Sequence, residues 1–90
     1  MVFITHVRLS SEGQRHEHII EVKWRNADDG KTGSNTVAEM VDWIENKKGK
    51  AKVTDGRNTV DVGVVDAKPK YLRTYADGVW TDNLLSLPRY

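Results

Sequence analysis

The sequence contains no cysteine among its 90 residues. Without thiols the chain cannot form disulfides, use thiolate catalysis or hold zinc through cysteine ligands. Long apolar runs are also missing, because no segment approaches the roughly 20 apolar residues that a transmembrane helix requires. The first ten residues lack the basic region and the long apolar stretch of a signal peptide. These absences predict a soluble, cytoplasmic protein that does not associate with membranes.

The sequence has almost no excess of charge of one sign. Fourteen Lys and Arg residues stand against 13 Asp and Glu residues, for a formal net charge of +1. This balance argues against a strongly electrostatic partner such as duplex DNA. The one basic cluster, KKGKAK at 47–52, fits a solvated helix end followed by a turn. A chain of this length, 38% hydrophobic, predicts a single domain over residues 1–90, since half of it could not bury a core.

The first part of the chain predicts a β-hairpin. Residues 2–9 are β-like in composition, and residues 18–24 alternate between apolar and charged side chains. A four-residue loop between Ser10 and Arg15 unites most of the apolar positions on one face. The pairs expected from this register are Phe3–Val22, Thr5–Ile20, Val7–His18 and Arg8–Glu17.

A helix is predicted after a long polar loop at 26–35. Thr36 and Glu39 have the spacing of a capping box, in which each side chain binds the other residue's backbone N–H. A stripe with the spacing of one helical face follows, formed by Val37, Met40, Val41 and Ile44. Gly49 is suited to the left-handed conformation that often ends a helix.

Two further hairpins are predicted downstream. Residues 50–54 and 59–65 flank the turn DGRN and place Val53 opposite Val60. After a break at 66–70, the segment YLRTYADGVWTDNLL (71–85) folds back at Asp77-Gly78, which favours a two-residue turn. One face of this last hairpin is then expected to carry Tyr71, Arg73, Tyr75, Trp80, Asp82 and Leu84.

The order of predicted elements is ββαββ followed by the C-terminal hairpin. It indicates an α+β domain, in which one helix packs on a mainly antiparallel sheet of five to six strands. The final residues, 84–90, are expected to pack over an edge of this sheet.

The aromatic face of the last hairpin has two interpretations. In the structural one, the Arg73 guanidinium stacks on the neighbouring rings and pairs with Asp82 inside the fold. In the functional one, the rings stack a base or a sugar while Arg73 binds a phosphate or carboxylate. The sequence leaves both open. The candidate ligand-binding residues are Tyr71, Arg73, Tyr75, Trp80, Asp82 and Asn83, with Arg15, His16 and Lys70 at the rim.

The segments RHEHIIEVKW (15–24), TVAEMVDWIE (36–45) and VGVVDAKPKYLRTYADGVWTDNLLSLP (62–88) resemble a family of small bacterial and phage proteins. This family is known only as a domain of unknown function, number three-eight-nine-two. The resemblance covers nearly the whole chain and transfers no catalytic residues. It implies a stand-alone cytosolic domain encoded by bacteria, phages or prophages, a setting in which small domains bind host proteins or sequester host defence signals.

Motifs for other chemistries are weak. His16 and His18 point the same way on an extended strand, but the expected register places His6 on the opposite face, which disfavours a metal site. GKT at 30–32 lacks the upstream glycine of a phosphate-binding loop, because Arg25 stands there. No GxSxG motif or Ser-His-Asp set comes together either. Neither an enzyme activity nor a cofactor or metal is predicted.

The sequence therefore predicts a non-catalytic binding module for an anionic, nucleotide-like small molecule, for example one that sequesters signalling nucleotides. The alternative is a protein–protein interaction domain that uses the same aromatic face to bind a host protein or a second copy of itself. Nucleic acid and membranes are not expected partners.

Overall fold

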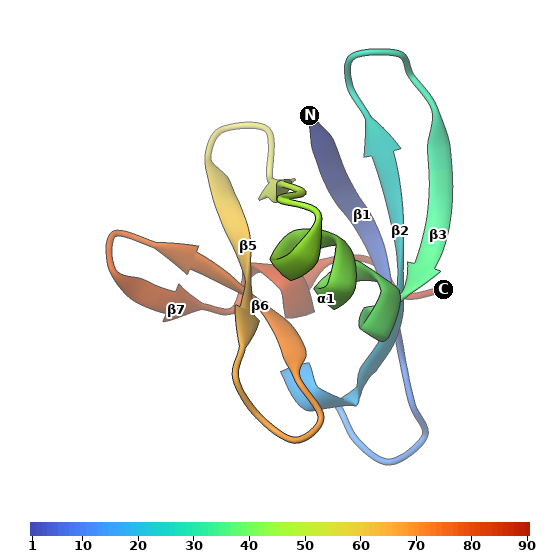
Figure 1. Cartoon of the computed structure of the whole chain (residues 1–90), viewed down its shortest axis with the longest axis vertical. Coiled ribbons are helices and arrows are strands. Elements are labelled where there is room, and N and C mark those ends of the chain that lie inside the picture. Colours follow the sequence, from blue (N-terminus) through green and yellow to red (C-terminus); the bar gives the residue numbers. More distant parts are fainter.

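The structure is a computed structural model that describes all 90 residues. It contains seven strands, one α-helix and two short 3-10 helices (Figure 1). The strands are β1 (Val2–Leu9), β2 (Ile19–Asn26), β3 (Thr32–Thr36), β4 (Ala51–Thr54), β5 (Thr59–Val65), β6 (Tyr71–Ala76) and β7 (Val79–Thr81). The helices are α1 (Val37–Asn46) and the 3-10 helices η1 (His16–His18) and η2 (Asn83–Ser86).

The strands form one sheet in the order β3-β2-β1-β4-β5-β6-β7. It has seven strands and is mixed, because β1 and β4 run parallel; this corrects the expected mainly antiparallel sheet of five to six strands. The parallel pair follows from the chain path, since β2, β3 and α1 together form the long crossover that parallel neighbours require. The α+β class with a single helix is confirmed.

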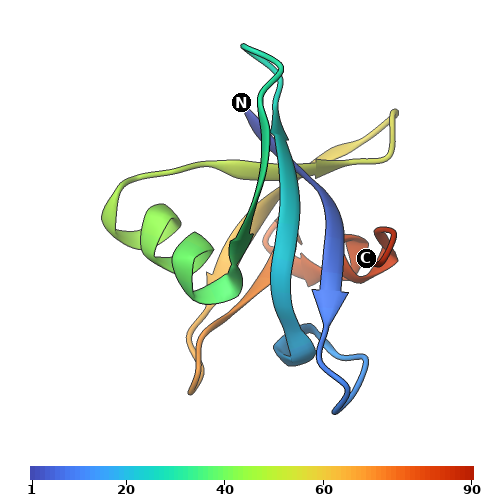
Figure 2. The ribbon, with the colours of Figure 1, turned by 90° about the vertical axis from the view of Figure 1, so that its right-hand side faces the viewer.

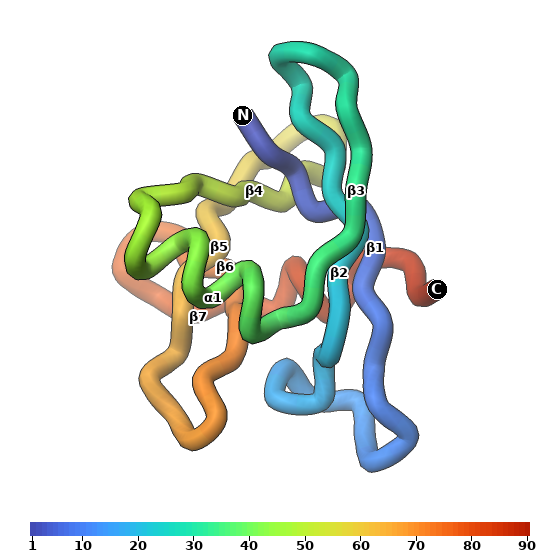
Figure 3. Tube along the Cα trace, turned by 45° about the vertical axis from the view of Figure 1, so that its right-hand side comes forward, coloured from blue at the N-terminus to red at the C-terminus, as the bar shows by residue number.

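Helix α1 packs against both halves of the curled sheet. It contacts β2 and β3 on one side and β5 and β6 on the other. Figure 1 shows it lying across the opening between these two groups of strands, and Figure 2 shows the C-terminal segment on the far side of β1 and β2. The tube view shows how β3 runs directly into α1 (Figure 3). The core is enclosed between the curled sheet and this helix. Its buried residues are Ile4, Val7, Ile19, Val22, Val37, Met40, Val41, Ala51, Val53, Val62, Leu72 and Leu84.

The register of the first hairpin differs from the expected one. Val7 pairs with Val22, and Phe3 pairs with Arg25. The register shifts at Thr5, so that Ile4 and Val7 both face the core although they lie three positions apart. Strict alternation could not produce this arrangement, and the connection is longer than four residues because it contains η1.

The predicted loop at 26–35 is partly wrong, because its second half forms β3. The sequence of this strand, TGSNT, is poor in residues that favour strands. It forms by pairing with β2, with Gly33 opposite Trp24.

Helix α1 begins as predicted. Thr36 Oγ1 accepts a hydrogen bond from the Glu39 backbone N–H, and Glu39 Oε1 accepts one from the Thr36 N–H. The predicted left-handed residue is wrong, because Lys48 has the positive φ of 57° and Gly49 does not. Gly49 instead lies against the ring of Trp43, where a Cβ would be 2.2 Å from the nearest ring atom.

The last two hairpins are confirmed. Val53 pairs with Val60, and Tyr75 pairs with Trp80 across the left-handed turn at Asp77-Gly78. Leu84, expected on the face of the last hairpin, is instead fully buried in η2.

The C-terminal residues, expected over an edge of the sheet, lie along the part of β1 beyond its pairs with β4, and β1 itself is interior in the sheet order. The Val7 N–H donates to the Pro88 carbonyl, and the Tyr90 N–H donates to the Val7 carbonyl, at 3.0 and 3.3 Å. The Tyr90 hydroxyl donates to Glu21 Oε1 at 2.6 Å. Burial, together with this contact, raises the pKa of Tyr90 to about 12.

Candidate functional site

A polar pocket of about 350 Å³ lies where the loop before η1, strand β6 and the segment around η2 meet. We call it the Arg73 pocket. Its lining residues are Gln14, Arg15, His16, Glu17, Tyr71, Arg73, Asp82, Leu85 and Ser86. Its volume falls at the lower end of the range of small-molecule sites, about 300–1,000 Å³.

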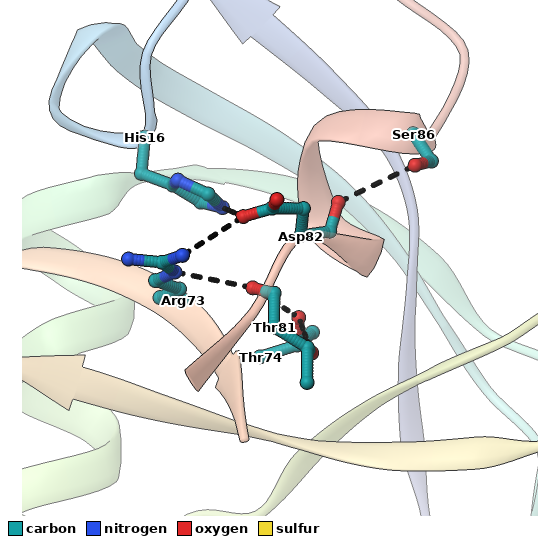
Figure 4. A network of polar contacts seen from close by, with 6 residues as sticks. All are labelled: His16, Arg73, Thr74, Thr81, Asp82 and Ser86. Carbon is teal, nitrogen blue, oxygen red and sulfur yellow. Dashed lines mark hydrogen bonds and ion pairs between the residues drawn. The ribbon is translucent and has the colours of Figure 1, made fainter. Parts of the chain in front are cut away.

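Arg73 is held in the pocket by the turn that joins β6 to β7. Its Nε donates to the Thr81 carbonyl at 3.2 Å, and its Nη2 donates to Asp82 Oδ1 at 2.9 Å (Figure 4). Behind it, the buried Thr74 hydroxyl donates to the same carbonyl and accepts a hydrogen bond from Thr81 Oγ1. Arg73 Nη1 makes no hydrogen bond, so one end of the fixed guanidinium is free to bind a ligand.

His16 lies beside Arg73 and is only 8% exposed. Its Nε2 is buried without a hydrogen bond, and the nearest carboxylate oxygen, Asp82 Oδ1, is 3.8 Å away. Burial, followed by the charge of Arg73, lowers the pKa of His16 below its ordinary value of 6.5, whereas Asp82 and Glu17 act in the opposite direction. The ring is therefore neutral at pH 7, and its contact with Asp82 is not an ion pair there.

Arg15 supplies the second cation of the Arg73 pocket. Its side chain is 83% exposed, and its only ion pair, with Glu17, is 4.0 Å long. Asp82, 73% exposed, occupies the position on Arg73 that a bound anion would take. Within the pocket two positive charges therefore face two negative ones, and the carboxylate on Arg73 is exposed to solvent. Exposed ion pairs contribute little to stability, about 0–1 kcal/mol, and here the carboxylate is the exposed partner while the Arg73 side chain is only 31% exposed.

The structure brings five of the nine predicted residues to this pocket, namely Arg15, His16, Tyr71, Arg73 and Asp82. Tyr75 and Trp80 share the face of Arg73 but do not line the pocket. Their rings meet edge to face, with centroids 5.3 Å apart. The Trp80 ring covers Gly63, where a Cβ would be 3.1 Å from the nearest ring atom. The aromatic face therefore divides into a polar pocket and a separate pair of rings.

The remaining two predicted residues lie outside the pocket lining. Asn83 begins η2. Lys70 Nζ donates to Glu45 Oε1 at 2.8 Å and so ties the start of β6 to α1. This contact raises the pKa of Lys70, through the hydrogen bond first and the charge of Glu45 second.

Sequence reasoning missed four lining residues: Gln14, Glu17, Leu85 and Ser86. They come from the two 3-10 helices and the loop before η1, elements for which the sequence carries no periodic signal. Only their proximity along the chain to His16 and Asp82 could have suggested them.

None of the helices has the length and apolar character that crossing a membrane would take. Comparison with family models gives one match, over residues 3–88, to a family described as "Protein of unknown function (DUF3892)". No curated protein and no solved structure shows significant similarity to the chain.

Proposed function

The chain belongs to the protein family of unknown function DUF3892, and from the Arg73 pocket we propose that it binds an anionic, nucleotide-like small molecule without chemical conversion. The observation that carries this proposal is the convergence of two guanidinium groups and a buried, unpartnered imidazole nitrogen on one open pocket. Guanidinium groups bind phosphates and carboxylates in a fork, and such bonds are stronger than those between neutral groups.

The ligand is expected to replace Asp82 on Arg73. A phosphate at this position would accept from Arg73 Nη1 and Nη2 and from the exposed Arg15. The ring of Tyr71 lines the same pocket and offers a surface for a sugar or a base. His16 lies behind these groups, and when protonated it would add a third positive charge.

Binding without turnover is supported by the positions of the pocket's hydroxyl and imidazole groups. Ser86 Oγ donates to the Asp82 carbonyl at 3.3 Å rather than to His16. Nucleophilic catalysis requires the nucleophile and its base to be within hydrogen-bond reach. A bacterial or phage setting, which the family resemblance implies, would fit a protein that sequesters a signalling nucleotide.

The proposal is tested by thermal shift with a panel of nucleoside monophosphates and cyclic dinucleotides. We expect at least one to raise the melting temperature of the wild type, and the shift to be lost in Arg73→Ala. Lys70→Ala also removes one positive charge, but Lys70 lies just before β6 and outside the pocket lining, so this variant should keep the thermal shift. Mass spectrometry of the denatured complex should recover the ligand intact, and a product in its place would contradict binding without turnover.

A protein–protein interaction through the tip of the last hairpin is the second candidate. Val79 is 62% exposed, and both Tyr75 and Trp80 are also exposed. They lie on β6 and β7, and β7 has a free outer edge in the sheet order. Exposed edges of this kind can pair with another chain. Val79→Lys should then abolish oligomerisation or partner capture while leaving the thermal shift by nucleotides unchanged.

A further inference from the structure

A second and larger hollow, of about 680 Å³, lies between α1 and the strands β1–β3. It shares no residue with the Arg73 pocket. We call it the tryptophan groove, and its lining residues are Val2, Trp24, Asn26, Asn35, Ala38, Glu39, Met40, Asp42, Trp43 and Lys47. Two of the three tryptophans of the chain therefore line one groove, one from the sheet and one from the helix.

Trp24 is fixed on β2 by contacts with β3. Its Nε1 donates to Asn35 Oδ1 at 2.8 Å. Its six-membered ring lies against Gly33, where a Cβ would be 2.6 Å from the nearest ring atom. The φ of Gly33 is not positive, so the glycine is required for the close approach of the ring rather than for an unusual backbone conformation.

Trp43 is held in a similar way on α1. Gly49 follows the helix with no positive φ, and a Cβ there would be 2.2 Å from the nearest atom of the Trp43 ring. The chain thus places a bare backbone against each indole. Both rings are half-buried at the edge of the core and are held in position before any ligand arrives.

The polar groups of the tryptophan groove offer mainly acceptors. Glu39 Oε1 accepts from Thr36 and Asn35, while its Oε2 makes no hydrogen bond. Hydrogen bonds from Thr36 lower the pKa of Glu39, which therefore stays ionised. Asp42 Oδ1 accepts from Asn46, and its Oδ2 has only Lys47, at 3.8 Å. Two carboxylates against one lysine leave the groove with a net negative charge.

From the two fixed rings and the free carboxylate oxygens, we propose that the tryptophan groove binds a planar ring that carries an amino or amidine group. The ring stacks on or between the indoles, and its N–H groups donate to Glu39 Oε2 and Asp42 Oδ2. A cationic ring gains further from the indole faces, which attract positive charge. This site goes beyond the proposed anion binding and has the opposite charge preference.

The test follows the indole N–H signals of the wild-type protein by NMR. The chain has three tryptophans, so Trp24, Trp43 and Trp80 each give one signal and report separately. Two pairs of probes are used. Benzamidine and benzoate have the same ring and opposite charges, and adenosine and inosine differ in the exocyclic amine.

We expect benzamidine and adenosine to shift the signals of Trp24 and Trp43 but not that of Trp80. Benzoate and inosine should shift them much less at equal concentration. Asp42→Asn, at an exposed helix position, should weaken benzamidine binding by about three- to fivefold, the effect of one exposed charge contact. Asp66→Asn removes an exposed carboxylate outside the groove and should leave it unchanged.

Equal shifts by benzoate and benzamidine would overturn the proposal, as would the absence of shifts with all four probes or a shift of Trp80 alone. Because Arg73→Ala does not touch the tryptophan groove, these shifts should persist in that variant. Failure here is thereby separated from failure of the anion site.

Discussion

The Arg73 pocket and the tryptophan groove differ in what holds them open. The groove is shaped by close contacts between rings and glycine backbones, Trp24 with Gly33 and Trp43 with Gly49, which a ligand would not replace. The pocket is lined by the half-exposed ion pair between Arg73 and Asp82, in which, under our proposal, an anion replaces Asp82. The tryptophan groove is therefore the more rigid of the two. In the Arg73 pocket, the Asp82 carboxylate already occupies the place proposed for the ligand.

The two regions also differ in their free hydrogen-bonding groups. The Arg73 pocket has unused donors on Arg15 and Arg73, whereas the tryptophan groove has unused acceptors on Glu39 and Asp42. Under the two proposals, the hollows of this small domain favour ligands of opposite charge. A near-neutral total charge is compatible with such local preferences, because each hollow presents its own free hydrogen-bonding groups to a ligand.

The largest effect is expected from Gly49→Ala, which tests the rigidity of the tryptophan groove through the stability of the protein. The added Cβ must displace the Trp43 ring or the backbone, and overpacking of this kind lowers the free energy of unfolding by about 1–3 kcal/mol. Urea denaturation measures the change. Lys50→Ala, at an exposed neighbour, should stay within about 0.5 kcal/mol. If Gly49→Ala is as stable as the wild type, the ring is not fixed in the way proposed.

The second prediction concerns the Arg73 pocket, where Asp82→Asn is expected to raise the affinity for an anion. Removal of the carboxylate frees Arg73, so the affinity for a phosphate-bearing ligand should rise by about fivefold, the effect of one exposed ion pair. Isothermal titration with phenyl phosphate measures it. Asp77→Asn is the matched control, because Asn tolerates the left-handed turn position and the residue lies outside the pocket. A loss of affinity in Asp82→Asn would instead mean that the carboxylate contacts the ligand.

The smallest expected effect is the pH dependence of stability that arises from His16 in the Arg73 pocket. The pKa of His16 is lowered in the folded protein, so the unfolded chain binds a proton first as pH falls. The stability that the neutral ring contributes is therefore complete above pH 6.5 and is lost as pH falls through the lower folded pKa. Urea denaturation between neutral and mildly acidic pH should show this decline, and His16→Gln should reduce it. If the stability of the variant falls with pH as steeply as that of the wild type, a group other than His16 causes the decline.

Sequence patterns predicted the parts of the fold that depend on local signals. The capping box of Thr36 and Glu39 and the turn at Asp77-Gly78 were sufficient to define α1 and the last hairpin, and that turn brought Arg73 and Asp82 together. The Arg73–Asp82 ion pair of the structural interpretation forms, but Asp82 is 73% exposed and the pair is not enclosed inside the fold. The ligand contact of the functional interpretation stays a prediction. The pair itself lines the pocket.

What the sequence could not predict depends on non-local packing. The irregularity at Thr5 and strand β3 arise from the demands of the core and of a neighbouring edge, so alternation and propensity gave no sign of them. The glycine–tryptophan contacts join residues whose proximity only the folded chain reveals. Gly49 does lie at the helix end, where its N–H donates to the Trp43 carbonyl at 2.9 Å, but its contact with the Trp43 ring has no signal in the sequence.

The central claim, that one domain carries two hollows of opposite charge preference, is tested most directly by NMR titration with two probes that share a phenyl ring. Phenyl phosphate should shift the backbone amides of Arg15, His16 and Arg73 and leave the indole signals of Trp24 and Trp43 in place. Benzamidine should do the reverse. Shifts of the same set of signals by both probes, or of neither set by phenyl phosphate, would contradict the account.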